Sequence, residues 1–182
     1  MDAATAGIEV LYSAAEIAER VTALAAAIAH DLGPELLLVA VLKGSFVFAA
    51  DLLRALHFAG LQPEVDFMTL SSYGSGTESS GRVKIGRDVE DNVGGRRVLL
   101  VDDILESGRT LAFAKALLEE RGAMVKVCVL LDKPVAGSRA VRADYVGFLC
   151  PDRFVVGYGL DYAHRYRELP YIGAFAPPPG AS

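Results

Sequence analysis

The sequence predicts a single α/β domain with a parallel central sheet flanked by helices. Short apolar runs of strand length alternate with segments of helical periodicity, and polar segments that suit a ligand crevice follow several of the runs. Hydrophobic residues make up 52% of the 182 residues, which is sufficient for one domain with a full-sized core. We expect this domain to span residues 1–175 and residues 176–182, which are rich in proline, to form a disordered tail.

The first elements are a helix, a strand and a second helix. The capping box Ser13–Glu16 begins a helix that runs to about Ala29. Leu36–Leu42 is a continuous apolar run, typical of a strand that is covered on both faces. From Phe46 to Ala59 the apolar residues recur at helical spacing, with charged residues between them.

A second strand then completes a β–α–β unit. Val65–Leu70 predicts this strand, so the sheet should be parallel. The Ser- and Gly-rich segment Ser71–Gly81 cannot pack into a core and is expected to form a mobile loop. Arg82–Arg87 alternates in polarity and indicates a short strand that returns from this loop.

The second half of the chain repeats the pattern. Strands are predicted at Arg97–Val101 and Met124–Leu131, and between them a helix from Thr110 to Arg121 is closed by Gly122. The pattern weakens after Pro134. Short strands are expected there at Tyr145–Phe148 and Phe154–Val156.

Composition and charge exclude several classes of function. The formal net charge of −5 argues against nucleic acid as a partner, because non-specific binding needs a basic surface. No apolar run approaches the roughly 20 residues that a membrane-spanning helix needs, and the N-terminus lacks the basic start of a signal peptide. Cys128 and Cys150 have no metal-ligand spacing and are interpreted as reduced, buried thiols. We therefore expect a cytoplasmic protein without a membrane partner.

Four polar segments each follow a predicted strand. They are Lys43-Gly44-Ser45, Ser72-Tyr73, Asp102-Asp103 and Asp132-Lys133. In an open parallel sheet the carboxyl ends of the strands form the ligand crevice. These segments should therefore lie together at one edge of the sheet.

The segment from Val98 to Leu111 combines two adjacent carboxylates with a phosphate cradle. Asp102 and Asp103 end a buried strand, where carboxylates are costly unless they have partners such as ribose hydroxyls or Mg²⁺. The loop from Glu106 to Thr110 then brings backbone N–H groups, two hydroxyl side chains and a helix N-terminus together, which suits a phosphate. The spacing is that of neither a P-loop nor a dinucleotide fingerprint.

This segment resembles the phosphoribosyl-pyrophosphate signature of the type I phosphoribosyltransferases. Further segments resemble the hypoxanthine-guanine branch of that family in order and approximate spacing: Leu42–Ser45, Ser71–Gly74, Asp132-Lys133 and Phe154–Tyr162. The resemblance covers roughly Leu36–Tyr171. It implies the type I phosphoribosyltransferase fold, with a small hood formed by the N-terminal and C-terminal segments, and a homodimer or homotetramer.

The resemblance implies an enzyme of purine salvage, a pentosyltransferase that transfers the 5-phosphoribosyl group of phosphoribosyl pyrophosphate to hypoxanthine or guanine. The products would be IMP or GMP and pyrophosphate. Lys43 and Gly44 match the pyrophosphate loop, in which the peptide bond before the lysine is often cis, and Arg167 matches a pyrophosphate contact. Ser72 and Tyr73 match a lid that excludes water from the reacting centre.

The resemblance also implies Mg²⁺ and a set of ribose and phosphate contacts. Asp102 and Asp103 match the pair that binds the ribose hydroxyls, directly or through Mg²⁺, and Asp161 matches a second Mg²⁺ ligand near the pyrophosphate. The 5′-phosphate would be held by the loop residues Ser107, Gly108, Arg109 and Thr110.

The purine base would contact a third group of residues. Lys133 matches the lysine that donates to the purine 6-oxygen, which favours an oxo over an amino group. Phe154 matches the aromatic residue that stacks on the base, and Val155 adjoins it in the same motif. Both residues also have a non-functional interpretation. Lys43 could be a surface lysine at the end of a strand, and Phe154 could be an ordinary core residue.

Glu106 departs from the family, which usually has aspartate at this position as the general base or acid. Glutamate keeps the carboxylate on an arm longer by one methylene, and a catalytic group misplaced by about 1 Å can cost on the order of a hundredfold in rate. We expect Glu106 to remain the base. The alternatives are a phosphoribosyltransferase for xanthine or adenine, a catalytically weak regulatory homologue that binds a nucleotide or RNA, and a nucleotide-binding oxidoreductase, against which the missing glycine fingerprint argues.

Overall fold

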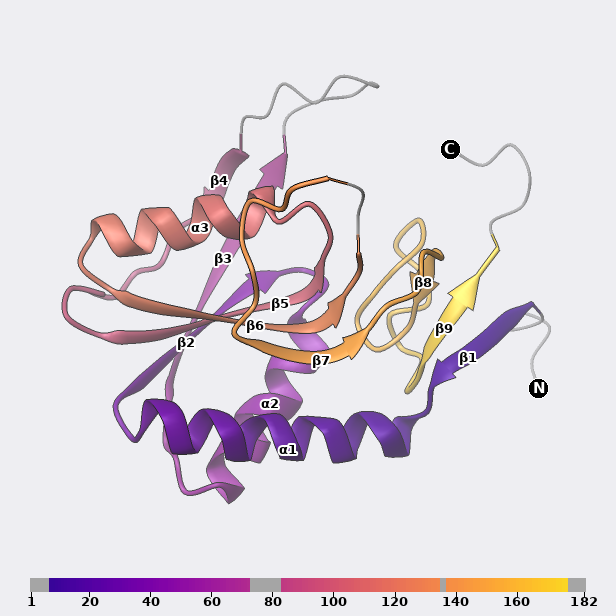
Figure 1. Cartoon of the computed structure of the whole chain (residues 1–182), viewed down its shortest axis with the longest axis horizontal. Coiled ribbons are helices and arrows are strands. Elements are labelled where there is room, and N and C mark those ends of the chain that lie inside the picture. The colour runs from indigo at the N-terminus through magenta and orange to yellow at the C-terminus, as the bar shows by residue number, and fades with distance from the viewer. Residues whose placement is uncertain (1–6, 73–82, 135–136, 177–182) are drawn as a thin grey trace.

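The computed structural model describes residues 7–72, 83–134 and 137–176, and a six-stranded sheet forms its centre (Figure 1). The strand order is β4-β3-β2-β5-β6-β7. These strands are β2 (Leu36–Leu42), β3 (Glu64–Ser72), β4 (Val83–Arg87), β5 (Arg97–Leu105), β6 (Met124–Asp132) and β7 (Tyr145–Leu149). All neighbours pair in parallel except β3 and β4. The prediction of a parallel sheet is confirmed, with the correction that the returning strand β4 is an antiparallel edge.

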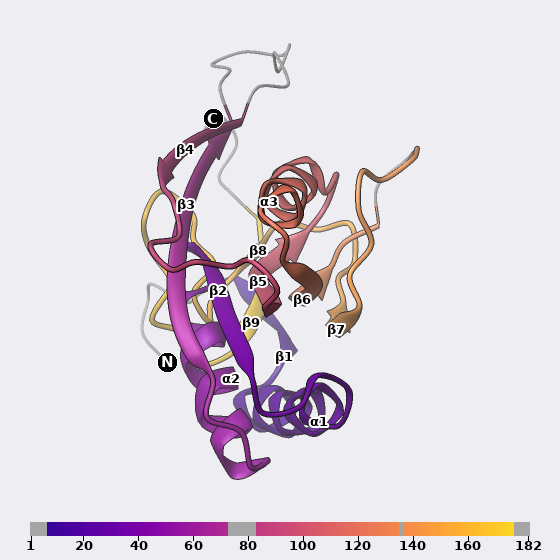
Figure 2. The same ribbon diagram turned by 90° about the vertical axis from the view of Figure 1, so that its left-hand side faces the viewer.

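Three helices cover the two faces of this sheet (Figure 2). They are α1 (Ala14–Leu32), α2 (Phe46–Phe58) and α3 (Arg109–Glu120). Successive side chains of a strand point to opposite faces, and accordingly Leu36 and Leu38 pack with α1 and α2, whereas Leu37 and Val39 pack with α3. Covering on both faces explains why β2 is a continuous apolar run rather than an alternating one.

Strands from the two ends of the chain form a separate small sheet. Its order is β1 (Ile8–Tyr12), β9 (Ile172–Phe175) and β8 (Val155–Val156), and both pairs are antiparallel. The Tyr12 ring stacks on Phe148 of β7 with ring centroids 4.2 Å apart, and its hydroxyl donates to the carbonyl oxygen of Leu149. The expected hood therefore exists and is fixed to the edge strand of the main sheet (Figure 1).

Strand β5 continues four residues beyond its predicted end at Val101. It keeps its pairing with β6, since Asp102 lies opposite Val129 and Leu105 lies opposite Asp132. The prediction that the two aspartates follow the strand is therefore wrong, because both lie within β5. The loop predicted at Ser71–Gly81 starts too early, because Ser71 and Ser72 still belong to β3. Its remaining residues, 73–81, and the tail from residue 177 lie outside the described residues.

Both cysteines are free and buried, as predicted. Burial raises the pKa of the Cys128 thiol, so this side chain behaves as a small apolar core residue. Among the described helices, none combines the length and the hydropathy needed to cross a bilayer.

Candidate active site at the carboxyl edge of the sheet

The turn after β2 lies directly against the carboxylates at the end of β5. A Cβ atom added to Gly44 would lie 1.6 Å from Oδ2 of Asp103, so only glycine fits between the two segments. The Leu42–Lys43 peptide bond is cis, as the resemblance implies, and the Lys43 side chain is exposed. The buried Ser45 hydroxyl donates a 2.5 Å hydrogen bond to the carbonyl oxygen of Val41, which fixes the turn where it enters α2.

Asp102 and Asp103 form a partly buried pair of carboxylates. The backbone N–H of Asp103 donates to Asp102 Oδ1 over 2.9 Å, and that of Ile104 donates to Asp103 Oδ1 over 2.9 Å. Burial, and next the charge of Asp103, raise the pKa of Asp102 well above its usual value. Burial also raises the pKa of Asp103, although its hydrogen bonds with Asp102 and the Ile104 N–H, and then the charge of Arg167, oppose this rise. Both carboxylates would therefore gain from a cation.

The donor atoms of this pair fit Mg²⁺. The ion prefers carboxylate oxygens and usually keeps several waters, so one or two protein carboxylates suffice. Within the part of the chain that the structure describes, no three acidic, His or Cys side chains come together as a complete metal cage. Asp102 and Asp103 would hold the ion together with substrate oxygens and water.

A second loop packs on the Gly44 turn and carries Asp161 and Arg167. Arg167 pairs with Asp161 Oδ1 at 2.6 Å and donates a 2.5 Å hydrogen bond to the carbonyl oxygen of Gly159. Gly159 has φ +98°, and a Cβ atom there would lie 2.3 Å from the carbonyl oxygen of Gly44. The predicted pyrophosphate residues are therefore brought together, with Asp161 paired to Arg167.

The loop between β5 and α3 forms a small cavity at the helix N-terminus. The cavity measures about 180 Å³ and is lined by Asp102, Ile104 and the residues from Leu105 to Leu111. Gly108 is the N-cap residue with φ +72°, and the Arg109 N–H lies 3.5 Å from the Ser107 hydroxyl. A left-handed N-cap turns successive N–H groups toward one point, which suits a phosphate.

Lys133, which was predicted to contact the purine base, meets the predicted general base Glu106 at this edge. Lys133 Nζ lies 3.1 Å from Glu106 Oε1 and 3.7 Å from Asp152 Oδ1. Although burial disfavours the ammonium, the ion pair with Glu106 raises the pKa of Lys133. Phe154 is 45% exposed and meets the ring of Tyr162 edge-on at 5.7 Å, so it is not an ordinary core residue.

Three predicted residues lie within strands or outside the described residues, and two further residues were missed. Val155 is buried in β8, and Ser72 ends β3, whereas Tyr73 lies outside the described residues. The sequence analysis missed Asp152, which reaches Lys133 from an exposed loop, and Gly159, which touches Gly44 across the fold. No local pattern marks either contact, because both join segments far apart in the sequence.

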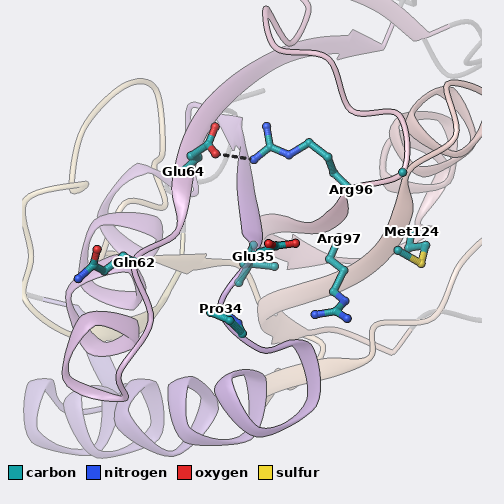
Figure 3. A pocket seen from close by; sticks show the side chains of 9 residues that line it. Pro34, Glu35, Gln62, Glu64, Arg96, Arg97 and Met124 are labelled. Atoms are coloured by element: carbon teal, nitrogen blue, oxygen red, sulfur yellow. Dashed lines mark ion pairs between the residues drawn. The ribbon is translucent and has the colours of Figure 1, made fainter.

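A polar hollow of about 400 Å³ lies at the opposite edge of the sheet, where β2, β3, β5 and β6 begin (Figure 3). Both of its arginines already have partners. Arg96 pairs with Glu64 at 2.9 Å, and Arg97 donates a 2.7 Å hydrogen bond to the carbonyl oxygen of Leu32. A ligand there would have to replace these contacts, so the carboxyl edge is the candidate active site.

Comparison with known proteins gives a consistent result. The phosphoribosyl transferase domain model matches residues 7–163. A hypoxanthine phosphoribosyltransferase of Salmonella typhimurium is 46% identical over 170 residues, covering 91% of this chain and 94% of that protein. A crystal structure of a hypoxanthine phosphoribosyltransferase from Staphylococcus aureus superimposes with a TM-score of 0.88 at 39% identity, covering 97% of this chain and 96% of that one.

The chain also matches part of a longer protein. The bifunctional protein TilS/HprT of Listeria innocua is 48% identical over 171 residues, which cover 93% of this chain. This chain spans only about a quarter (26%) of that relative's length. The family model and the full-length relatives agree with the geometry of the carboxyl edge: the chain belongs to the phosphoribosyltransferase family, in the branch of the hypoxanthine phosphoribosyltransferases.

Proposed function

We propose that this protein transfers the 5-phosphoribosyl group of phosphoribosyl pyrophosphate to hypoxanthine or guanine, giving IMP or GMP and pyrophosphate. The observation that carries this proposal is the Lys133–Glu106 ion pair of 3.1 Å beside the phosphate loop. The 6-oxygen and N7 are neighbours on one edge of a 6-oxopurine, so one ammonium and one carboxylate at this spacing can contact both atoms. An ammonium favours an oxo group and disfavours the amino group of adenine.

The charges of the site fit a displacement at the anomeric carbon. The purine nitrogen attacks this carbon as pyrophosphate leaves, through a transition state with oxocarbenium character. Lys43 and Arg167 stabilise the negative charge that develops on the leaving group. Mg²⁺, when held by Asp102 and Asp103, would add positive charge at the ribose and pyrophosphate oxygens. Ser107, Gly108, Arg109 and Thr110 anchor the 5′-phosphate, and this remote binding energy positions the reacting carbon.

Glu106 would manage the purine proton in this scheme. Its carboxylate is exposed and already reaches Lys133, so the longer arm places it on the base side of the loop. When the base binds, Lys133 would turn its hydrogen bond to the 6-oxygen and leave Glu106 free to accept or return the proton at N7. The remaining roles, for Ser72 and Tyr73 in a lid and for Phe154 and Val155 beside the base, complete the proposal.

A spectrophotometric assay with phosphoribosyl pyrophosphate and Mg²⁺, offering each base separately, tests this function. We expect turnover of hypoxanthine and guanine, loss of turnover with a chelator, and no turnover of adenine. Faster turnover of xanthine would indicate a xanthine-preferring enzyme. Binding of phosphoribosyl pyrophosphate without turnover of any base would contradict the proposal and favour a catalytically weak regulatory homologue.

We also propose that the protein is a cytoplasmic homodimer or homotetramer. Its free, buried thiols support the location. An apolar groove of about 990 Å³ between α1, α2 and residues 158–170 supports the assembly, because apolar patches of this kind mark protein interfaces. The groove and its rim present two exposed aromatic residues, Phe46 at 45% and Phe58 at 88% exposure.

Phe58→Asp is expected to weaken this assembly. The side chain is exposed in the monomer, so the substitution should leave folding intact while it places a charge in the contact. Sedimentation velocity should show the wild type as a dimer or larger, and the variant shifted toward the monomer at the same concentration. Met124→Asp is the control. The Met124 side chain is apolar and 57% exposed, and it lies at the start of β6, outside the groove, so this substitution should leave the assembly unchanged. A monomeric wild type at micromolar concentration would contradict the proposal.

A further inference from the structure

Arg139 holds two consecutive residues at the end of β6. It lies in the segment of residues 137–144 between β6 and β7, and its side chain is 19% exposed. One guanidinium nitrogen, Nη1, pairs with the carboxylate of Asp132, and the other, Nη2, donates a 2.6 Å hydrogen bond to the carbonyl oxygen of Lys133. The planar fork of arginine can hold two acceptors at once in a fixed geometry, which an ammonium cannot.

The backbone around Lys133 is fixed from its other sides as well. The N–H of Lys133 donates to the carbonyl oxygen of Leu105 over 2.9 Å, and the N–H of Cys150 donates to that of Asp132 over 2.8 Å. The carbonyl oxygen of Lys133 accepts its hydrogen bond from Arg139. Together these bonds fix the direction in which the Lys133 side chain leaves the backbone.

The segment that carries Arg139 also contacts the phosphate loop. The N–H of Ala140 donates to the carbonyl oxygen of Ser107 over 3.2 Å. Val141 packs on Gly108 so closely that a Cβ atom on this glycine would lie 3.0 Å from Val141 Cγ1. Arg139 and the two residues that follow it thus connect Lys133 with the loop between β5 and α3 that would hold the 5′-phosphate.

We propose that Arg139 is a positioning residue for base recognition, which acts by holding the peptide of Lys133 in place. The proposal rests on the proposed function, because it assigns Lys133 to the purine 6-oxygen. Arg139 contacts the lysine through its backbone carbonyl, whereas the ammonium pairs with Glu106, so Arg139 need not touch either substrate.

Arg139→Met is expected to raise the KM for hypoxanthine about tenfold, the size expected for hydrogen bonds of a charged group. The kcat and the KM for phosphoribosyl pyrophosphate should change much less, because the phosphate loop keeps its own contacts with Ala140 and Val141. Arg139→Lys keeps the charge but not the fork, and should give an intermediate KM. Arg142→Met, at an exposed arginine of the same segment, is the matched control and should behave like the wild type.

A double-mutant cycle with Lys133→Met separates positioning from a merely structural role. If Arg139 acts through the lysine, Arg139→Met should add little to the rise in KM that Lys133→Met causes alone. Additive effects, or a loss confined to kcat with an unchanged KM for the base, would overturn the inference. Should Arg139→Met fail to fold, the same kinetics on Arg139→Lys decide, and an unchanged KM for hypoxanthine rejects the proposal. An inactive wild type would instead reject the proposed function itself.

Discussion

Replacing Gly44 with alanine is expected to lower kcat/KM by about a hundredfold or more, the cost of displacing groups at a reacting centre by about 1 Å. The new methyl group would lie 1.6 Å from Asp103 Oδ2, far inside van der Waals contact. Either the carboxylate or the turn after β2 must move, and both belong to the proposed site. Overpacking of this kind also costs about 1–3 kcal/mol of stability. Steady-state kinetics and thermal unfolding measure the two effects.

Gly94→Ala is the matched control for this prediction. The backbone of neither glycine lies in the left-handed region, so in both cases the outcome depends on space alone. Gly94 lies in the turn that precedes β5, and a Cβ atom there would lie 3.3 Å from Asn92 Oδ1 and 3.4 Å from the carbonyl oxygen of Arg121. This variant should keep wild-type kinetics. Wild-type kinetics in Gly44→Ala as well would show that the close approach of Gly44 to Asp103 has no part in the reaction.

Asp102→Asn is expected to abolish most activity and at the same time to stabilise the ligand-free protein at neutral pH. Removal of one oxyanion-hole donor typically costs about 10²–10³ in kcat, and we expect a loss of similar size for a carboxylate at the reacting centre. The pKa of Asp102 is raised, first by burial and then by the charge of Asp103. The folded state therefore binds more protons than the unfolded state between the unfolded pKa of about 3.9 and the raised folded value. In this window stability falls as the pH rises, and asparagine lacks that cost.

Thermal unfolding at several pH values tests the sign of this effect. The variant should exceed the wild type in Tm at neutral pH, by roughly 2–4 °C for each kcal/mol gained. The difference should disappear below about pH 4, where the aspartate is protonated in both states. Asp91→Asn, at an exposed aspartate, is the control and should change neither Tm nor kcat. A variant less stable than the wild type at neutral pH would contradict the inferred charge burial.

The central sheet could be predicted from the sequence because its strands carry local signals. β2 begins and ends at the predicted residues, since burial on both faces makes Leu36–Leu42 one apolar run. The extension of β5 through Asp102 could not be predicted in this way, because two carboxylates read locally as the end of a strand. Its pairing with β6, from Arg97 to Leu105, overrides that local signal.

The candidate site was predictable to the extent that its residues follow strands. The resemblance identified Lys43, Asp103, Glu106 and Lys133, and the fold brings them to one edge of the sheet. Arg139 carries no comparable signal, since arginines in connecting segments are common and usually solvated. Its importance depends on contacts with Asp132 and Lys133 that exist only after the chain has folded.

The small sheet of β1, β9 and β8 delays the folding of the part of the site around Phe154. β1 pairs only with β9 among the described strands, and the two are separated by almost the whole chain. Phe154 also depends on β9, because its carbonyl oxygen accepts a 2.8 Å hydrogen bond from the N–H of Phe175. Contacts of such high contact order form late, and during synthesis they must wait until residue 175 has left the ribosome. The loop between β5 and α3 can thus form well before β9 holds Phe154. Because Phe154 is the residue proposed to stack on the base, the proposed base side of the site is completed last.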